Sequence, residues 1–274
     1  MPELPEVETV AKALHRTLQG RVVEKARFIG RCRYPFDAAA ATAALGRKAF
    51  CGVRRRAKYI IMDFDCDTAI LAHLGMTGYF HVDPVGSPLH KHDRIAFSLK
   101  DGEELRYADA RRFGFVKLVR MAVPGAMPEE LSALGPEPLE RSFSGKYLMK
   151  RAAGRKTPVK VFIMDQAVVV GVGNIYASEA LFGAGVDPRR PAGSLREDEW
   201  NGVAAEIKAV LRHALRRGGS TIRNYRTVDG SEGAFQRSLK VYGRSKDACH
   251  SCGGPITVAR QAGRSTFFCA ECQK

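Results

Sequence analysis

The chain is poor in acidic residues and contains no long apolar run. Its 274 residues include 29 Asp and Glu against 44 Lys and Arg, a net charge of +15. An excess of this size favours a polyanionic partner, nucleic acid above all. No stretch of about 18 apolar residues occurs, so we expect no transmembrane helix and no membrane partner.

Other absences narrow the class of protein further. The N-terminus lacks a basic segment followed by an apolar one, so no secretory signal is expected, and we find neither repeats nor low-complexity segments. Hydrophobic residues make up 45% of the chain, which argues against a disordered protein. We therefore expect a cytoplasmic protein with one large domain or two ordinary ones.

The order of local patterns predicts an α+β fold. A first helix begins near Pro5, a second covers residues 38–45, and short β-rich segments at 22–29, 50–56, 59–64, 69–74, 94–99, 104–108 and 115–119 predict a β-sandwich opened by a helix. Helical periods follow at 144–153, 159–165, 175–184 and 197–217. We expect domains at 1–123 (β-sandwich), 144–240 (helical) and 241–274 (cysteine-paired hairpin), with a Pro/Gly-rich linker at 124–143.

Four of the seven cysteines form two close pairs near the C-terminus. The spacing Cys-x2-Cys-x16-Cys-x2-Cys is typical of a structural zinc site, and it assigns one zinc ion to Cys249, Cys252, Cys269 and Cys272. Four thiolates fill a tetrahedral shell, so no position remains for a catalytic water. A redox or disulfide role is the alternative, which a cytoplasmic chain disfavours.

The three remaining cysteines are scattered through the β-rich region. Cys32, Cys51 and Cys66 each lie in an apolar or strand-like context. We expect all three to be small core side chains.

The N-terminus offers a candidate nucleophile. If Met1 is removed, Pro2 becomes a free secondary amine with Glu3 beside it. An α-amino group has a pKa of about 7.7–8.0, against about 10.4 for lysine, so far more of it is unprotonated near neutral pH. The ordinary alternative is a plain helix start, because Pro5 and Glu6 suit a first helical turn.

Two further motifs have the residue types that DNA contacts require. Asn174 lies in a Gly-flanked turn before a helix, where an anion is attracted, although the motif lacks the third glycine of a dinucleotide site. Arg111 and Phe113 lie beside a glycine turn, and Met76 lies between two glycines, as base-stack insertion would require. Core packing is the alternative for Phe113 and Met76, and a solvated surface position is the alternative for Lys58 and His92.

Taken together these segments resemble the bacterial formamidopyrimidine-DNA glycosylases, which repair oxidised purines. The resemblance runs from Pro2 to Lys274. It rests on PELPEVET at 2–9, RRAKY at 55–59, HLGMTG at 73–78, KHD at 91–93, DARRFG at 109–114, LGPEPL at 134–139, GVGNIYASE at 171–179, VYGR at 241–244 and the four-cysteine finger. It implies a helix–two-turn–helix arrangement for the helical domain.

The resemblance also implies roles for individual residues. Pro2 would be the Schiff-base nucleophile and Glu3 the acid/base, with Lys58 and the finger residue Arg264 as further catalytic groups. The DNA contacts would be His92, Arg111, Asn174 and Arg155, where relatives often carry Lys and where Lys156 could take the role; Met76, Arg111 and Phe113 would fill the void left by an extruded base. The segment 220–236 resembles a loop that covers the flipped base, and it is the least distinctive match.

The implied activity is a bifunctional glycosylase and abasic-site lyase of base excision repair. It would remove 8-oxoguanine and formamidopyrimidines and then cut the DNA strand by β,δ-elimination. It would act as a monomer on double-stranded DNA that contains oxidised purines or abasic sites. Its location would be the cytoplasm, at the nucleoid. One alternative is an endonuclease VIII-type glycosylase for oxidised pyrimidines. The other is a zinc-finger protein that binds damaged DNA without catalysis, against which Pro2, Glu3 and Lys58 argue.

Overall fold

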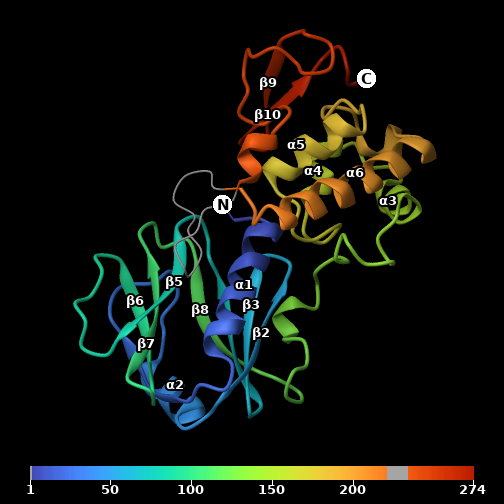
Figure 1. The fold of residues 1–274 in the computed structure, drawn as a ribbon. Coiled ribbons are helices and arrows are strands. Elements are labelled where there is room, and N and C mark those ends of the chain that lie inside the picture. Colours follow the sequence, from blue (N-terminus) through green and yellow to red (C-terminus); the bar gives the residue numbers. More distant parts are fainter. Residues whose placement is uncertain (1, 221–233) are drawn as a thin grey trace. The chain divides into compact units, whose positions relative to one another are not determined.

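The computed structural model describes residues 2–220 and 234–274 (Figure 1). The chain divides into two compact units: unit 1 comprises Met1–Ser132 with Ser220–Gly233, and unit 2 comprises Ala133–Gly219 with Ala234–Lys274. Within the described residues, no helix has the length and apolar character needed to cross a membrane.

Unit 1 is a sandwich of two antiparallel four-stranded sheets, as the sequence predicts. One sheet has the order β1-β6-β7-β5 and the other the order β2-β3-β4-β8. The strands are β1 (Val23–Phe28), β2 (Phe50–Arg56), β3 (Tyr59–Phe64), β4 (Thr68–His73), β5 (Gly78–Pro84), β6 (Asp93–Leu99), β7 (Glu103–Asp109) and β8 (Phe115–Arg120).

Alternating side chains of both sheets form one apolar core. Phe97 and Leu105 of the first sheet join Ile60 and Ile70 of the second, and all four are fully buried. A strand places successive side chains on opposite faces, so the alternate residues of β6 and β7 point away from this core. That outer face carries buried charged groups, which are described below.

Strand β5 is an element that the sequence pattern did not predict. Its alternation places Phe80 in the core, whereas His81 and Asp83 lie on the outer face, and Gly78 and Pro84 stand at its ends. Gly and Pro weaken a strand prediction. Pairing with β7 along the whole of β5 compensates, since every residue of β5 has a partner there.

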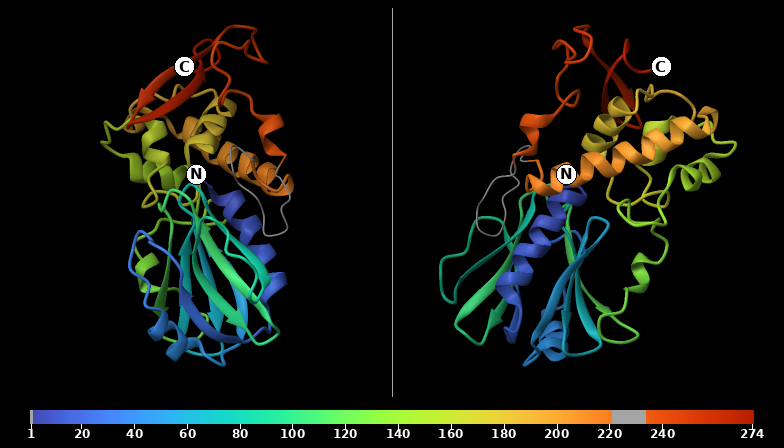
Figure 2. Two further views of the ribbon diagram at one scale, coloured as in Figure 1. Left: turned by 90° about the vertical axis from the view of Figure 1, so that its left-hand side faces the viewer. Right: turned by 45° about the vertical axis from the view of Figure 1, so that its right-hand side comes forward.

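Helix α1 (Leu4–Leu18) covers the edge of the sandwich, between the two sheets (Figure 2). Its apolar side chains Val7, Val10, Leu14 and Leu18 are buried in the same core. Helix α2 (Ala38–Leu45) matches its predicted bounds, and the Asp37 carboxylate caps it by accepting a hydrogen bond from the Ala40 N–H at 2.9 Å.

Unit 2 combines helices with a C-terminal hairpin. Its helices are α3 (Gly145–Ala152), α4 (Val159–Ile163), α5 (Asn174–Gly183) and α6 (Glu197–Arg216), and short 3-10 turns lie at Glu129–Leu131 in unit 1 and at Ala192–Ser194 and Phe235–Ser238 in unit 2. The amphipathic pattern of α6 buries Trp200, Val203, Ile207 and Leu211. The hairpin pairs β9 (Ile256–Gln261) with β10 (Arg264–Cys269).

The prediction for the scattered cysteines is wrong for Cys51. Cys32 and Cys66 pack against the core of unit 1 as expected, but Cys51 is exposed. Its neighbours Phe50 and Val53 turn inward, and the register of β2 shifts between Phe50 and Gly52, so Cys51 is left on the solvent side.

His73, at the end of β4, is a neutral side chain in the interior of unit 1. Its Nδ1 atom accepts a hydrogen bond from the Gly75 N–H at 3.0 Å. Burial, and then the nearby positive charges of Lys58 and Arg33, lower its pKa to about 4. Below about pH 6.5 the His73 imidazole therefore binds a proton in the unfolded chain more readily than in the folded protein.

We expect this histidine to make unit 1 sensitive to acid. Folding lowers the pKa of His73, so its contribution to the free energy of unfolding is complete above about pH 6.5. Below that pH the contribution falls by about 1.4 kcal/mol for each pH unit down to pH 4. His73→Asn keeps an acceptor for Gly75 but does not titrate. Urea unfolding at pH 4 to 7 should show a smaller acid loss in the variant, and identical pH profiles would contradict this assignment.

Candidate functional site

The N-terminus of α1 is anchored by a buried glutamate. The Glu6 carboxylate accepts a hydrogen bond from the Glu3 N–H at 2.8 Å, and its other oxygen accepts from the N–H of Ser220 at 2.7 Å and from its hydroxyl at 3.1 Å. Glu3 and Glu6 are 3% and 2% exposed, and Pro2 is buried. The first residues of a domain are ordered only when they are tied down, so Pro2 and Glu3 hold a defined position.

Lys58 is buried in unit 1, not solvated on its surface. It lies in the two-residue turn between β2 and β3, where Ala57 adopts a left-handed φ of 55°, and it is 6% exposed. Its charge contributes to the low pKa of His73. A buried ammonium beside a neutral imidazole differs from an ordinary surface lysine, which supports a functional role.

The three candidate void-filling residues lie on two loops that touch each other. Met76 and Phe113 are exposed by 39% and 45%, and the Arg111 guanidinium lies over the Phe113 ring at 4.7 Å. The loops pack through Gly75 and Gly114, since a Cβ atom on Gly75 would come within 2.3 Å of the Gly114 nitrogen. Large apolar side chains kept at the surface are typical of binding sites.

One buried carboxylate holds both loops. Asp109, at the end of β7, accepts hydrogen bonds from the Thr77 hydroxyl and from the N–H groups of Arg111 and Gly114, at 2.5, 3.1 and 2.8 Å. Burial and this carboxylate raise the pKa of Tyr107, whose hydroxyl stays protonated and donates to Asp109 at 3.3 Å. Asp109 therefore fixes the backbone of the two loops that carry Met76, Arg111 and Phe113.

Sequence reasoning placed His92 among the DNA contacts, and the structure places it in a turn before β6. Its side chain is partly exposed, and its backbone carbonyl accepts a hydrogen bond from the Asp109 N–H at 3.0 Å. The exposed Lys91 precedes it. Lys91 offers positive charge and His92 a ring N–H donor on unit 1, both of which can contact a phosphate.

In unit 2 the four paired cysteines converge as their spacing predicts. Their ligand atoms all lie within 4.8 Å of one another, and Sγ separations are 3.9 Å for Cys249 and Cys272 and 3.5 Å for Cys252 and Cys269. A zinc tetrahedron with bonds of about 2.3 Å needs sulfur separations near 3.8 Å. The geometry fits a zinc ion, which would cross-link the finger and leave no open coordination position.

The electrostatics of the cysteine cluster oppose ionisation of all four thiols when no cation lies between them. Burial alone would raise the pKa of Cys249, but the N–H groups of Ser251 and Cys252 lower it to about 7. The neighbouring Cys252 side chain, burial and Cys269 raise the pKa of Cys272 to about 12. Several thiolates this close together require a positive charge between them.

The finger presents Arg264 beside a tight turn. Ala262 and Gly263 both adopt positive φ, 46° and 75°, as a two-residue type I′ hairpin demands. Arg264 is the first residue of β10 and is exposed. Within unit 2 it lines a pocket of about 370 Å³.

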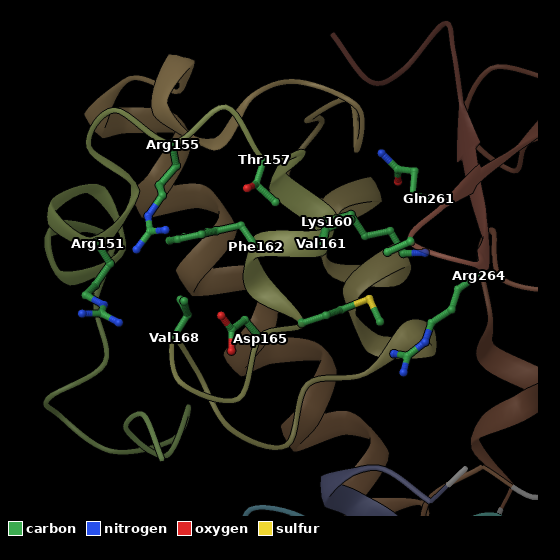
Figure 3. A pocket seen from close by; sticks show the side chains of 12 residues that line it. Arg151, Arg155, Thr157, Lys160, Val161, Phe162, Asp165, Val168, Gln261 and Arg264 are labelled. Atoms are coloured by element: carbon green, nitrogen blue, oxygen red, sulfur yellow. The ribbon is translucent and has the colours of Figure 1, made fainter. Parts of the chain in front are cut away.

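Arg155 lines the same pocket. Figure 3 shows Arg151 and Arg155 on one side of the pocket and Arg264 on the other, with the floor formed by apolar residues such as Phe162 and Val168. Of Arg155 and its neighbour Lys156, Arg155 is the one among the pocket-lining residues. The pocket is thus lined by three guanidinium groups, which are suited to binding phosphate, and by the carboxylate of Asp165.

Lys160 is a residue that the sequence reasoning did not single out. Its ammonium is fully buried and donates to Asn174 Oδ1, Thr266 Oγ1 and the Ser265 carbonyl, at 2.5, 2.8 and 3.1 Å. Asn174 in turn donates to the Ser265 carbonyl at 2.9 Å. Within unit 2 these bonds join α4 and the first residue of α5 to the finger. The available signal was a lysine inside the apolar run Val159–Ile163.

Glu179 joins two other motifs of unit 2. Its buried carboxylate accepts hydrogen bonds from the N–H groups of Lys240, Val241 and Tyr242, at 2.8 to 2.9 Å. The sequence stretches GVGNIYASE and VYGR are therefore in direct contact. The segment 220–236, expected to cover a flipped base, lies outside the described residues at positions 221–233.

Comparison with known proteins gives three matches that follow one another along the chain. Family models described as the formamidopyrimidine-DNA glycosylase N-terminal domain, the formamidopyrimidine-DNA glycosylase H2TH domain and the zinc finger found in FPG and IleRS match residues 1–116, 134–226 and 247–274. A β-sandwich, an H2TH domain and a four-cysteine finger in this order define the class: a zinc-finger DNA glycosylase.

Relatives support the match over the whole chain. Proteins named formamidopyrimidine-DNA glycosylase from Laribacter hongkongensis and Stenotrophomonas maltophilia are 45% and 44% identical, with all of both chains covered. The chain therefore belongs to the formamidopyrimidine-DNA glycosylase family.

Solved structures agree with this assignment. The MutM (Fpg) protein of Thermus thermophilus has a TM-score of 0.87 at 36% identity, covering 99% of this chain and 98% of its own. A MutM structure in complex with DNA containing carbocyclic 8-oxo-G has a TM-score of 0.87 at 31% identity, with both chains fully covered.

We expect Lys160 to stabilise unit 2. Lys160→Met keeps much of the side-chain volume but leaves three oxygens without this donor, at a cost on the order of 3 kcal/mol. Trp200, the single tryptophan, packs on Phe162 at 5.7 Å and reports unfolding by its fluorescence. The matched control is Lys150→Met, which replaces an exposed lysine of α3. Equal urea midpoints for the two variants would contradict the prediction.

Proposed function

We propose that the protein is a bifunctional DNA glycosylase and abasic-site lyase that removes oxidised purines during base excision repair. The observation that carries this proposal is the anchored N-terminus: Pro2 and Glu3 are buried at the start of α1 and held by Glu6. An ordinary capping box accounts for the pairing of Glu3 with Glu6 but not for its burial, which is costly for two carboxylates.

The first chemical step forms a covalent bond between protein and sugar. Once Met1 is removed, the unprotonated Pro2 nitrogen attacks C1′ of the damaged nucleotide, and the C1′–base bond breaks with its electron pair leaving on the base. The Pro2 N–H proton passes to the departing base, and Glu3 protonates the sugar-ring oxygen O4′ as the C1′–O4′ bond breaks and the ring opens. A secondary amine gives an iminium ion, whose fixed positive charge withdraws electrons from the sugar.

Strand cleavage follows from that iminium ion. It acidifies the C2′–H bond, so loss of a C2′ proton expels the 3′ phosphate, and a second elimination expels the 5′ phosphate. Water then releases the sugar fragment from Pro2. Lys58 and Arg264 are the proposed additional proton-transfer and phosphate groups for these steps.

DNA distortion exposes the target nucleotide. Met76 and Phe113, both exposed, and Arg111 would enter the base stack in place of the extruded nucleotide. Extrusion costs a few kcal/mol, which phosphate contacts from His92, Arg155 and Asn174 offset. The net charge of +15 is suited to these contacts and to double-stranded DNA as the partner.

The proposed substrate class is oxidised purine, and the proposed location is the bacterial cytoplasm at the nucleoid. The relatives at 42% to 45% identity bear the formamidopyrimidine enzyme's name, which supports a purine substrate over the oxidised pyrimidines of endonuclease VIII-type enzymes. A binding protein without catalysis would have no use for an anchored amine at Pro2.

We expect cleavage of an 8-oxoguanine duplex by the wild-type protein and at least about a hundredfold slower base release by Glu3→Gln, because the amide cannot protonate O4′. Single-turnover gels on 8-oxoguanine, formamidopyrimidine and thymine-glycol duplexes measure both rates and preference. Glu8→Gln, one turn further along α1, is the matched control. Faster cleavage of thymine glycol would favour the pyrimidine enzyme, and full turnover by Glu3→Gln would remove Glu3 from the mechanism.

A further inference from the structure

A network of buried charges lies on the outer face of the first sheet. Arg106 is 0% exposed, Glu104 1% and Asp93 3%. Arg106 is within ion-pair distance of Glu104 at 3.0 Å, Asp83 at 3.4 Å and Asp93 at 3.6 Å. No step of the proposed chemistry uses these residues, so the cost of burying them calls for another role.

His81 bridges two carboxylates of this network. Its Nδ1 atom lies 2.7 Å from Asp83 Oδ2 and its Nε2 atom 2.8 Å from Asp93 Oδ1. A neutral imidazole has one donor and one acceptor nitrogen, whereas an ionised carboxylate only accepts. Both bonds can form together only if His81 is the imidazolium cation.

The charge balance of the network agrees with that protonation state. The three carboxylates Asp83, Asp93 and Glu104 face two guanidinium groups, Arg106 and Arg27, whose Nη2 is 2.7 Å from Glu104. Burial alone would raise the pKa of Glu104, but hydrogen bonds from Arg27, Ser98 and Arg106 lower it. A charged His81 makes the number of positive charges equal to the number of negative ones.

His90 stacks on His81 but does not complete a metal site with it. The two rings are parallel, with 1° between their planes and centroids 4.4 Å apart, and His90 Nε2 lies 3.9 Å from Asp83 Oδ2. Nitrogen lone pairs lie in the ring planes, so those of stacked parallel rings do not converge on one ion. His81 and Asp83 therefore belong to a hydrogen-bonded charge cluster, and His90 stacks on it.

The network fixes the segment that leads to the exposed Lys91 and His92. Arg106 donates to the carbonyls of Ser87 and Pro88, both at 3.0 Å. Asp93, the carboxylate bonded to His81, also accepts from the His90 N–H at 2.9 Å, while its own N–H donates to the His90 carbonyl at 3.1 Å. One end of the 87–93 segment thus depends on Arg106, which pairs with both carboxylates that contact His81, and the other end depends on one of those carboxylates, Asp93.

We propose that the His81 imidazolium is a positioning residue that holds Lys91 and His92 for contact with a DNA phosphate. Loss of its proton removes a donor from one carboxylate and leaves Asp83 and Asp93 repelling each other. The 87–93 segment then loosens, and duplex affinity falls as pH rises. This inference rests on the proposed DNA-binding function of His92.

The test first replaces the imidazole at position 92, so that His81 is studied apart from it. His92→Lys supplies a phosphate contact whose charge is constant between pH 6 and 8.5 and serves as the background. Fluorescence anisotropy at fixed ionic strength measures the Kd for a duplex with an uncleavable tetrahydrofuran abasic analogue. We expect the Kd of this variant to rise about three- to fivefold from pH 6 to 8.5, roughly the effect of losing one positioned surface charge.

Two variants at position 81 give opposite results if the proposal holds. His81→Arg in the same background provides a permanent cation, so binding should stay tight with a flat pH profile. His81→Gln should bind at every pH as weakly as the background does at pH 8.5. If the His81→Arg protein kept the pH profile of the His92→Lys background, the proposal would be overturned. A separate His90→Gln variant measures the contribution of His90.

A measurement without DNA keeps the proposal distinct from the proposed function. The side-chain ¹⁵N shifts of His81 should be those of imidazolium at pH 6.5, and exchange of the His90 amide, corrected for intrinsic rates, should quicken as His81 deprotonates. A neutral His81 at pH 6.5 would refute the positioning role. Failure of the wild type to release oxidised bases would refute the glycosylase function alone.

Discussion

The buried carboxylate of Glu6 is the interaction on which the proposed active site depends. One oxygen holds the backbone of Glu3 and the other holds Ser220, a residue more than 200 positions away in sequence. Removing such an acceptor would leave buried N–H groups unpaired, at about 1–3 kcal/mol each. The N-terminal residues, which would otherwise fray, are thereby kept where an amine can act as a nucleophile.

Unit 1 repeats this arrangement at two other places. Asp109 holds the backbone of the loops that carry Met76, Arg111 and Phe113, and Asp93 with Arg106 holds the segment that carries Lys91 and His92. In each case the groups proposed to face DNA are exposed or partly exposed, and the carboxylates that orient them are buried. Preorganised contacts lose less entropy when the ligand binds, which increases affinity.

Much of the fold could be predicted because its signals are local. Cysteine spacing predicted the finger, short segments rich in β-branched and aromatic residues predicted seven of the eight sandwich strands, and α2 has its predicted bounds. Strand β5 was not predicted, because Gly78 and Pro84 argue against a strand and its pairing with β7 is a long-range contact.

The site was predictable to a similar extent and for similar reasons. Pro2, Glu3 and the candidate void-filling residues stand out as unusual residue types in short motifs. The roles of Lys160, Asp109 and His81 depend on partners that are distant in sequence or on another strand, and Lys160 reads locally as one charge in an apolar helix. Hydrogen bonds of this kind become visible only in three dimensions.

The central claim is that the Pro2 nitrogen bonds to the sugar. Its most direct test is to reduce the complex with an 8-oxoguanine duplex by borohydride, digest protein and DNA, and sequence the modified peptide by tandem mass spectrometry. The reduced sugar should be attached to the nitrogen of Pro2, in a peptide that begins at Pro2 and lacks Met1. A sugar attached to Lys58 or to any other side chain would contradict the claim.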